Sequence, residues 1–139
     1  MLAPLIAWGL LAGAAAPGSV DADVTGLRSA KGQLHVCLTT RQDRFPDCQK
    51  DPVARRVTVA TSEGHEIRFE GLPTGDYALA LIHDENGNGK LDTVMGIPRE
   101  GFGFSNNPTI RFGPPKFVES RIAVTSGGND ETVKVKYLL

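Results

Sequence analysis

In the stretch "HDENGNGKLD", residues 83–92, side-chain oxygens are spaced so that several of them could bind one cation. Candidate cation ligands alternate along it: the side chains of Asp84, Asn86, Asn88 and Asp92 and the main-chain carbonyl of Lys90. Alternate side chains of a curled loop point inward, and Gly89 permits the sharp turn that brings the later ligands round. Oxygen ligands at this spacing are typical of a calcium loop, so a weak calcium site is one interpretation of this stretch.

The stretch departs from an EF-hand loop at the twelfth position, where Met95 replaces the bidentate glutamate. A further oxygen would have to come from Glu100 or from a main-chain carbonyl, and we expect weak affinity. The alternative is a tight reversal in which Asp84 and Asp92 accept hydrogen bonds from local amides. The sequence leaves both interpretations open.

A second candidate site follows in "REGFGFSNN", where two phenylalanines alternate with glycines. Phe102, Phe104, Asn106 and Asn107 could form an aromatic and amide platform for a glycan or a peptide strand. The alternative is that the phenylalanines pack inward as the core of their own loop. Ser105 lacks the G-x-S-x-G turn of a serine nucleophile.

The three histidines have no metal-ligand spacing, since His35, His65 and His83 are far apart in the chain. We expect them to be solvated or hydrogen-bonded, with His83 placed to orient Asp84 or to cover its loop. His35 is out of phase with the apolar residues around it and should face away from the core.

Charge argues against two classes of partner. The chain has 15 Lys and Arg against 16 Asp and Glu. Nucleic acids and anionic membranes favour a basic excess, so we expect neither as the main partner.

The N-terminal residues 1–22 resemble a signal peptide, because an uncharged apolar run precedes small residues at Val20 and Ala22. We expect cleavage after Ala22, a mature domain of residues 23–139 without a membrane span, and export to the periplasm or the outside. An uncleaved N-terminal anchor is the alternative. In an oxidising compartment Cys37 and Cys48 should form a structural disulfide, which favours pairing over a redox or metal role.

Hydrophobic residues alternate with a period of two through most of the chain, which predicts an all-β fold. "DYALALIHD", residues 76–84, is apolar on both faces and should be a central strand. "GGND", residues 127–130, predicts a hairpin turn between the last two strands. The pattern indicates a single antiparallel β-sandwich of about seven strands, with one long ordered loop over residues 84–116.

Residues 83–107 closely resemble the signature of a family of secreted bacterial proteins, domain of unknown function 2141. The upstream "GLPTGDYALALIHD" and the downstream "GPPKF" fit the same family. The "GLPTGDY" turn also resembles small transthyretin-like and prealbumin-like sandwiches; an immunoglobulin-like arrangement is the other expectation. The family resemblance implies a small exported β-sandwich without an established activity.

Taken together, these features predict a non-enzymatic binding or structural module of the cell envelope. The alternative from another class is a small carbohydrate-active enzyme or other hydrolase that uses acids of residues 84–107. For glycosidase chemistry, Glu70, Asp76 and Glu100 are the acids that would have to meet. A purely structural protein whose edge strands pair with a partner is a third hypothesis.

Overall fold

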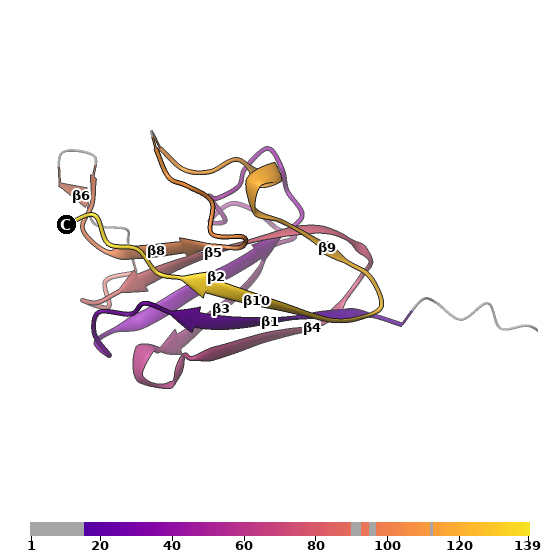
Figure 1. Cartoon of the computed structure of the whole chain (residues 1–139), viewed down its shortest axis with the longest axis horizontal. Coiled ribbons are helices and arrows are strands. Elements are labelled where there is room, and N and C mark those ends of the chain that lie inside the picture. The colour runs from indigo at the N-terminus through magenta and orange to yellow at the C-terminus, as the bar shows by residue number, and fades with distance from the viewer. Residues whose placement is uncertain (1–15, 90–92, 95–96, 112) are drawn as a thin grey trace, which may run out of the picture.

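The computed structural model describes residues 16–89, 93–94, 97–111 and 113–139, and within them the protein is an all-β sandwich (Figure 1). The strands are β1 (Gly18–Thr25), β2 (Gln33–Thr39), β3 (Arg55–Ala60), β4 (Glu66–Leu72), β5 (Gly75–Asp84), β6 (Thr93–Val94), β7 (Ile97–Pro98), β8 (Gly101–Phe104), β9 (Arg121–Val124) and β10 (Gly127–Lys134). Two short 3-10 turns, η1 (Thr61–Glu63) and η2 (Phe117–Ser120), interrupt the connections.

Two main sheets form the sandwich. Sheet A has the order β10-β1-β4, and sheet B has the order β3-β2-β5-β8, with β9 also pairing with β5. Strands β6 and β7 form a small separate hairpin. The prediction of an all-β sandwich is therefore confirmed.

The core between the sheets is built by the alternation visible in the sequence. On β2, Leu34, Val36 and Leu38 are buried, as are Ile67 and Phe69 on β4. Successive strand residues point to opposite faces, so one apolar residue in two is enough to make a core. The core consists of Val20, Ala22, Val24, Leu34, Val36, Leu38, Ile67, Phe69, Leu72, Tyr77, Leu79, Leu81, Ile122, Val124, Val133 and Val135.

Strand β5 is the central strand that its sequence predicted. It pairs antiparallel with β2 along one edge, and with β8 and β9 along the other. Its inner residues Tyr77, Leu79 and Leu81 enter the main core, while Ala78 and Ala80 are buried on the outer face. The continuous apolar run of "YALAL" thus reflects cover on both faces.

The predicted terminal hairpin is wrong. Strand β9 pairs with β5 in sheet B, whereas β10 pairs with β1 in sheet A, so the chain crosses between sheets at residues 125–126. The "GGND" residues lie within β10, where Gly127 is beside Gly18 and Asp130 is beside Asp21. This β1–β10 pair is parallel, so the sandwich is not purely antiparallel.

Strand β1 crosses the expected cleavage point after Ala22. Val20 and Ala22 are 0% and 1% exposed, and both belong to the main core. Gly18–Ala22, which precede the predicted start of the mature domain, are therefore part of the sandwich. No helix within the described ranges is long and apolar enough to cross a membrane.

Candidate functional site

The outer face of sheet B is divided into two regions. We call the region around Cys37, Thr39, Ala78 and Ala80 the closed half, because two long loops fold over it. The first loop is residues 40–54, and the second runs from Ser105 to η2. We call the region around Gln33, His35, Thr58, Ile82 and Asp84 the open half. Their register places these residues on one face, since His35 is opposite both Thr58 and Ile82.

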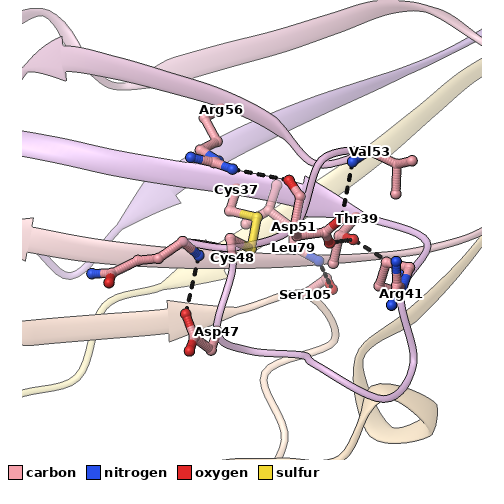
Figure 2. Close-up of a disulfide and its surroundings, with 11 residues drawn as sticks. Cys37, Thr39, Arg41, Asp47, Cys48, Asp51, Val53, Arg56, Leu79 and Ser105 are labelled. Carbon is pink, nitrogen blue, oxygen red and sulfur yellow. Dashed lines mark hydrogen bonds between the residues drawn. A yellow bond between two sulfur atoms is a disulfide. The ribbon is translucent and has the colours of Figure 1, made fainter.

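A disulfide holds the first loop on the closed half (Figure 2). As the sequence predicted, Cys37 of β2 forms a disulfide with Cys48. The two Cα atoms are 6.4 Å apart. The hydroxyl of Thr39 donates to the buried carboxylate of Asp51, which also accepts from the amide of Val53 at 3.0 Å. This polar loop is therefore fixed by one covalent bond and by satisfied buried groups.

A small second core fills the space under the two loops. Phe45 of the first loop packs edge-to-face on Phe117 of η2, with ring centroids 6.0 Å apart, and the cluster covers Ala78 and Ala80. Figure 1 shows residues 40–54 beside the segment that leads into η2. Ser105 fixes the second loop, because its hydroxyl donates to the carbonyl of Ser120 at 2.5 Å and accepts from the amide of Leu79 at 3.0 Å. Because Ser105 is fully buried and its hydroxyl is engaged in both hydrogen bonds, this residue has a structural role.

The Phe and Gly alternation on β8 has a packing explanation. A Cβ at Gly101 would meet the ring of Tyr137 and lie 2.6 Å from Val135, and one at Gly103 would lie 2.7 Å from Val133. Glycine is needed on the inner face because side chains of β10 and the segment after it press against the β8 backbone. The phenylalanines therefore point to the outer face.

These phenylalanines do not form the exposed platform that the sequence suggested. Phe102 is buried, and Phe104 is half-buried against Phe45, with ring centroids 5.9 Å apart. Both rings pack against other side chains of the protein, so the alternative interpretation describes them better than an exposed platform does.

The two asparagines are engaged by the protein's own backbone. The amide of Asn107 donates to the carbonyl of Thr132 at 2.7 Å, and its carbonyl oxygen accepts from the amide of Lys134 at 2.8 Å. Asn106 donates to the carbonyl of Arg121 at 2.8 Å. The side chain of Asn107 thus pairs with β10 as a short strand would, and it protects this sheet edge.

The open half contains a row of three hydrogen-bonded side chains from three adjacent strands. Nε2 of His35 is 2.8 Å from Oδ2 of Asp84, and Nδ1 of His35 is 2.9 Å from the hydroxyl of Thr58. Asp84 is fully buried, the His35 side chain is 29% exposed, and Thr58 is exposed. We refer to these residues as the Thr58–His35–Asp84 relay.

Asp84 also shapes the start of the predicted calcium loop. Its carboxylate accepts from the amides of Gly89 at 2.7 Å and Asn88 at 3.2 Å. Burial acts to raise the pKa of Asp84, but the hydrogen bonds from His35 and these amides outweigh it and hold the pKa below its ordinary value. The carboxylate is therefore ionised and is an acceptor only.

The calcium prediction is only partly covered by the described residues. The side-chain oxygen of Asn86 accepts from the amide of Asn88 at 3.2 Å, the same amide that donates to Asp84, so two oxygens converge there. Lys90 and Asp92 lie outside the described residues. Within the described ranges no three His, Cys, Asp or Glu side chains are grouped to hold a metal. The turn interpretation accounts for the bonds seen at Asp84, and calcium binding stays a prediction.

His83 does not orient Asp84. It is fully buried, its Nε2 donates to the carbonyl of Lys31 at 2.8 Å, and its Nδ1 is 2.7 Å from the Tyr137 hydroxyl. Since a carbonyl only accepts, neutral His83 has its proton on Nε2 and accepts from Tyr137. It joins the β1–β2 connection to the segment after β10.

Arg28 extends this end of the sandwich into a larger network. Its guanidinium donates to Glu85 at 2.5 and 2.8 Å and lies 4.4 Å from the centre of the Tyr137 ring. The hydrogen bond from Arg28 lowers the pKa of Glu85, which also accepts from Ser29 at 2.9 Å. The rim of the open half is thus anchored on the side of Glu85.

The three acids considered for glycosidase chemistry have separate surroundings. Glu70 pairs with Arg68 at 2.6 Å, and Asp76 lies 3.7 Å from Arg121. Glu100, also the candidate for a further calcium ligand, is buried.

The relay was missed by sequence reasoning, because its members are 23 and 49 residues apart. The outward phase of His35 was correctly predicted. Thr58 and Asp84 could have been recognised as partners of His35 only from the pairing of β2 with β3 and β5. No local sequence pattern specifies that pairing.

Comparison with known proteins identifies one family. No curated protein and no solved structure matches the chain. A family model described as an uncharacterized protein conserved in bacteria, DUF2141, matches residues 22–133. That range includes the relay, the disulfide and both loops of the closed half. The chain therefore belongs to the DUF2141 family.

Proposed function

We propose that this protein is an exported, non-enzymatic β-sandwich module of the cell envelope that binds its partner through the open half of sheet B. The observation that carries the proposal is the contrast between the two halves of one sheet face. Loops, a disulfide and buried hydrogen bonds cover the closed half, whereas the exposed side chains of Gln33 and Thr58 and the part-exposed His35 remain accessible.

The chemistry of the open half suits a polar partner. The imidazole of His35 and the hydroxyl of Thr58 are held by hydrogen bonds on adjacent strands, so little of their side-chain entropy is lost on binding. The exposed amide of Gln33 lies on the same strand as His35. Half-buried Ile82 adds an apolar contact between them. A glycan or an extended peptide offers the matching hydroxyl and amide groups.

Calcium is a finer part of the proposal. A cation near the two converging oxygens of Asp84 and Asn86 would order the loop at the rim of the open half. Its expected role is to stabilise the binding surface rather than to perform chemistry.

Export is supported by the disulfide, since paired cysteines persist in oxidising compartments. The burial of Val20 and Ala22 favours processing before Gly18, because cleavage after Ala22 would remove five of the eight residues of β1. Intact mass of protein recovered from cell fractions tests this. We expect an oxidised product in the envelope or medium that retains β1; a reduced, full-length cytoplasmic product would contradict export.

Binding is tested by nuclear magnetic resonance of the ¹⁵N-labelled protein. The probes are a disaccharide of N-acetylglucosamine and an extended alanine-rich peptide. We expect shifts of the Gln33, His35 and Thr58 amides with at least one probe. Thr58→Glu should weaken binding, whereas Thr132→Glu, at an exposed threonine of sheet A, should not. Shifts confined to sheet A would refute the proposed surface.

A further inference from the structure

The relay has a defined direction of hydrogen bonding. Because the Asp84 carboxylate only accepts, Nε2 of neutral His35 must carry the proton and donate to it. Nδ1 of His35 is then the acceptor, and the hydroxyl of Thr58 donates to it at 2.9 Å. The chain of donors runs from the exposed hydroxyl through the imidazole to the buried carboxylate.

This is the arrangement that activates a hydroxyl nucleophile. A hydroxyl attacks a carbonyl poorly unless a base within hydrogen-bond reach takes its proton, and the base needs a third group to fix its orientation and tautomer. His35 meets the first requirement and Asp84 the second. All three residues lie on paired strands, so the geometry is set before any reactant arrives.

We propose that Thr58 is a nucleophile that accepts an acyl group from an ester or thioester, in a single acyl transfer that forms a covalent link to the protein. This role goes beyond the proposed binding function and does not depend on it.

The step balances without an oxidant or a metal. Oγ of Thr58 forms a bond to the carbonyl carbon of the donor, and its proton moves to Nδ1 of His35. Asp84 stays ionised and stabilises the imidazolium. The tetrahedral adduct breaks its bond to the leaving oxygen or sulfur, which takes the proton from His35. The products are an ester at Thr58 and a free alcohol or thiol.

The exposure of Thr58 places no limit on the size of the donor. The hydroxyl lies on an exposed strand, so a donor carried on a large partner could reach it as well as a small one. Esters and thioesters share the electrophilic carbonyl and a good leaving group, so either source fits the chemistry.

The test is acylation of the full, disulfide-bonded protein with p-nitrophenyl acetate as the ester and S-acetyl-N-acetylcysteamine as the thioester. Tryptic mapping by mass spectrometry locates the acetyl groups, and hydroxylamine distinguishes esters on threonine, which it removes, from amides on lysine. We expect Thr58 to be acetylated about 100-fold faster than the exposed Thr132, the size of a general-base contribution. Whichever of the two reagents acetylates Thr58 shows whether the donor class is an ester or a thioester.

Variants separate chemistry from folding. Thr58→Ser should keep the reaction and Thr58→Val should abolish the acetyl ester at this position. His35→Ala should slow it by about 100-fold, and added imidazole should restore part of the rate, which a merely structural histidine would not allow. Asp84→Asn should slow it as well, because Asp84 positions His35. His65→Ala, at an exposed histidine outside the relay, is the matched control and should react like the wild type.

Melting temperatures confirm that each variant is folded before labelling. The proposal is overturned if folded wild-type protein is acetylated at Thr58 no faster than at Thr132 with both donors. Equal rates in the wild type and in folded His35→Ala would overturn it too. The relay would then serve only to tie three strands together.

Discussion

On the closed half of sheet B two loops cover the outer face, whereas on the open half Gln33 and Thr58 stay exposed, although the same two central strands, β2 and β5, run through both. The two loops that carry Phe45 and Phe117 reach over the closed half because each brings an aromatic ring to the small alanines of β5. At the open half the corresponding positions are Ile82 and Asp84, and the relay lies beside them. Alanines on the central strand thus mark where aromatic rings of the loops pack, whereas the exposed positions of the open half, Gln33 and Thr58, lie on the neighbouring strands.

The largest expected effect comes from removing an aromatic ring of the closed half. Phe117→Ala should lower the free energy of unfolding by about 3–5 kcal/mol, because it empties a buried aromatic site. Ile82→Ala on the open half should cost about 1 kcal/mol, since its side chain is only half-buried. Urea unfolding of both variants measures the difference. Equal losses would mean that the two halves are covered alike.

The disulfide gives the next largest effect. The double variant Cys37→Ser and Cys48→Ser should lose about 2–4 kcal/mol, because the unfolded loop regains its freedom. Limited proteolysis should then cut within residues 40–54, while the amide signals of His35 and Thr58 stay unchanged. Changed signals there would show that the disulfide also shapes the open half.

A smaller effect is expected on the open half from Asp84. Because the pKa of Asp84 is lowered by folding, its carboxylate stabilises the fold at pH values above the ordinary carboxyl pKa of 3.8. This stabilisation is lost as the pH falls through the folded-state pKa. Asp84→Asn should cost about 1–3 kcal/mol at neutral pH, because His35 and two amides lose a charged acceptor. Thermal melts from pH 2 to 7 should show a shallower acid dependence for the variant. Parallel curves would contradict the assignment.

Calcium should give the smallest effect. With a dissociation constant near 10⁻⁴ M, ~1 mM calcium would stabilise the fold by about 1.4 kcal/mol, and magnesium would do much less. Melting temperatures with calcium and with a chelator measure this, and Asp84→Asn combined with Asp92→Asn is the control. Identical wild-type values would show that the loop is only a turn.

Much of the fold was predictable, because it depends on local pattern. The alternation in β2 and β4 fixed which residues face the core, and the apolar run of β5 identified the central strand. The long connection after β5 was correctly recognised, but β8 within it was not, since glycine has low strand propensity. Gly101 and Gly103 form a strand because side chains from β10 and beyond press against them.

The sequence by itself determined the all-β class, the inward and outward phase of strands such as β2 and β4, and a cysteine pair close enough to join. These properties follow from the two-residue period of a strand and from short chain separations. Tertiary structure alone decided that β1 lies parallel to β10, that Asn107 protects a sheet edge, and that Thr58, His35 and Asp84 meet. Strand pairing joins residues that are distant in the chain and is set by the packing of the whole core. It therefore cannot be predicted from the local sequence around each residue.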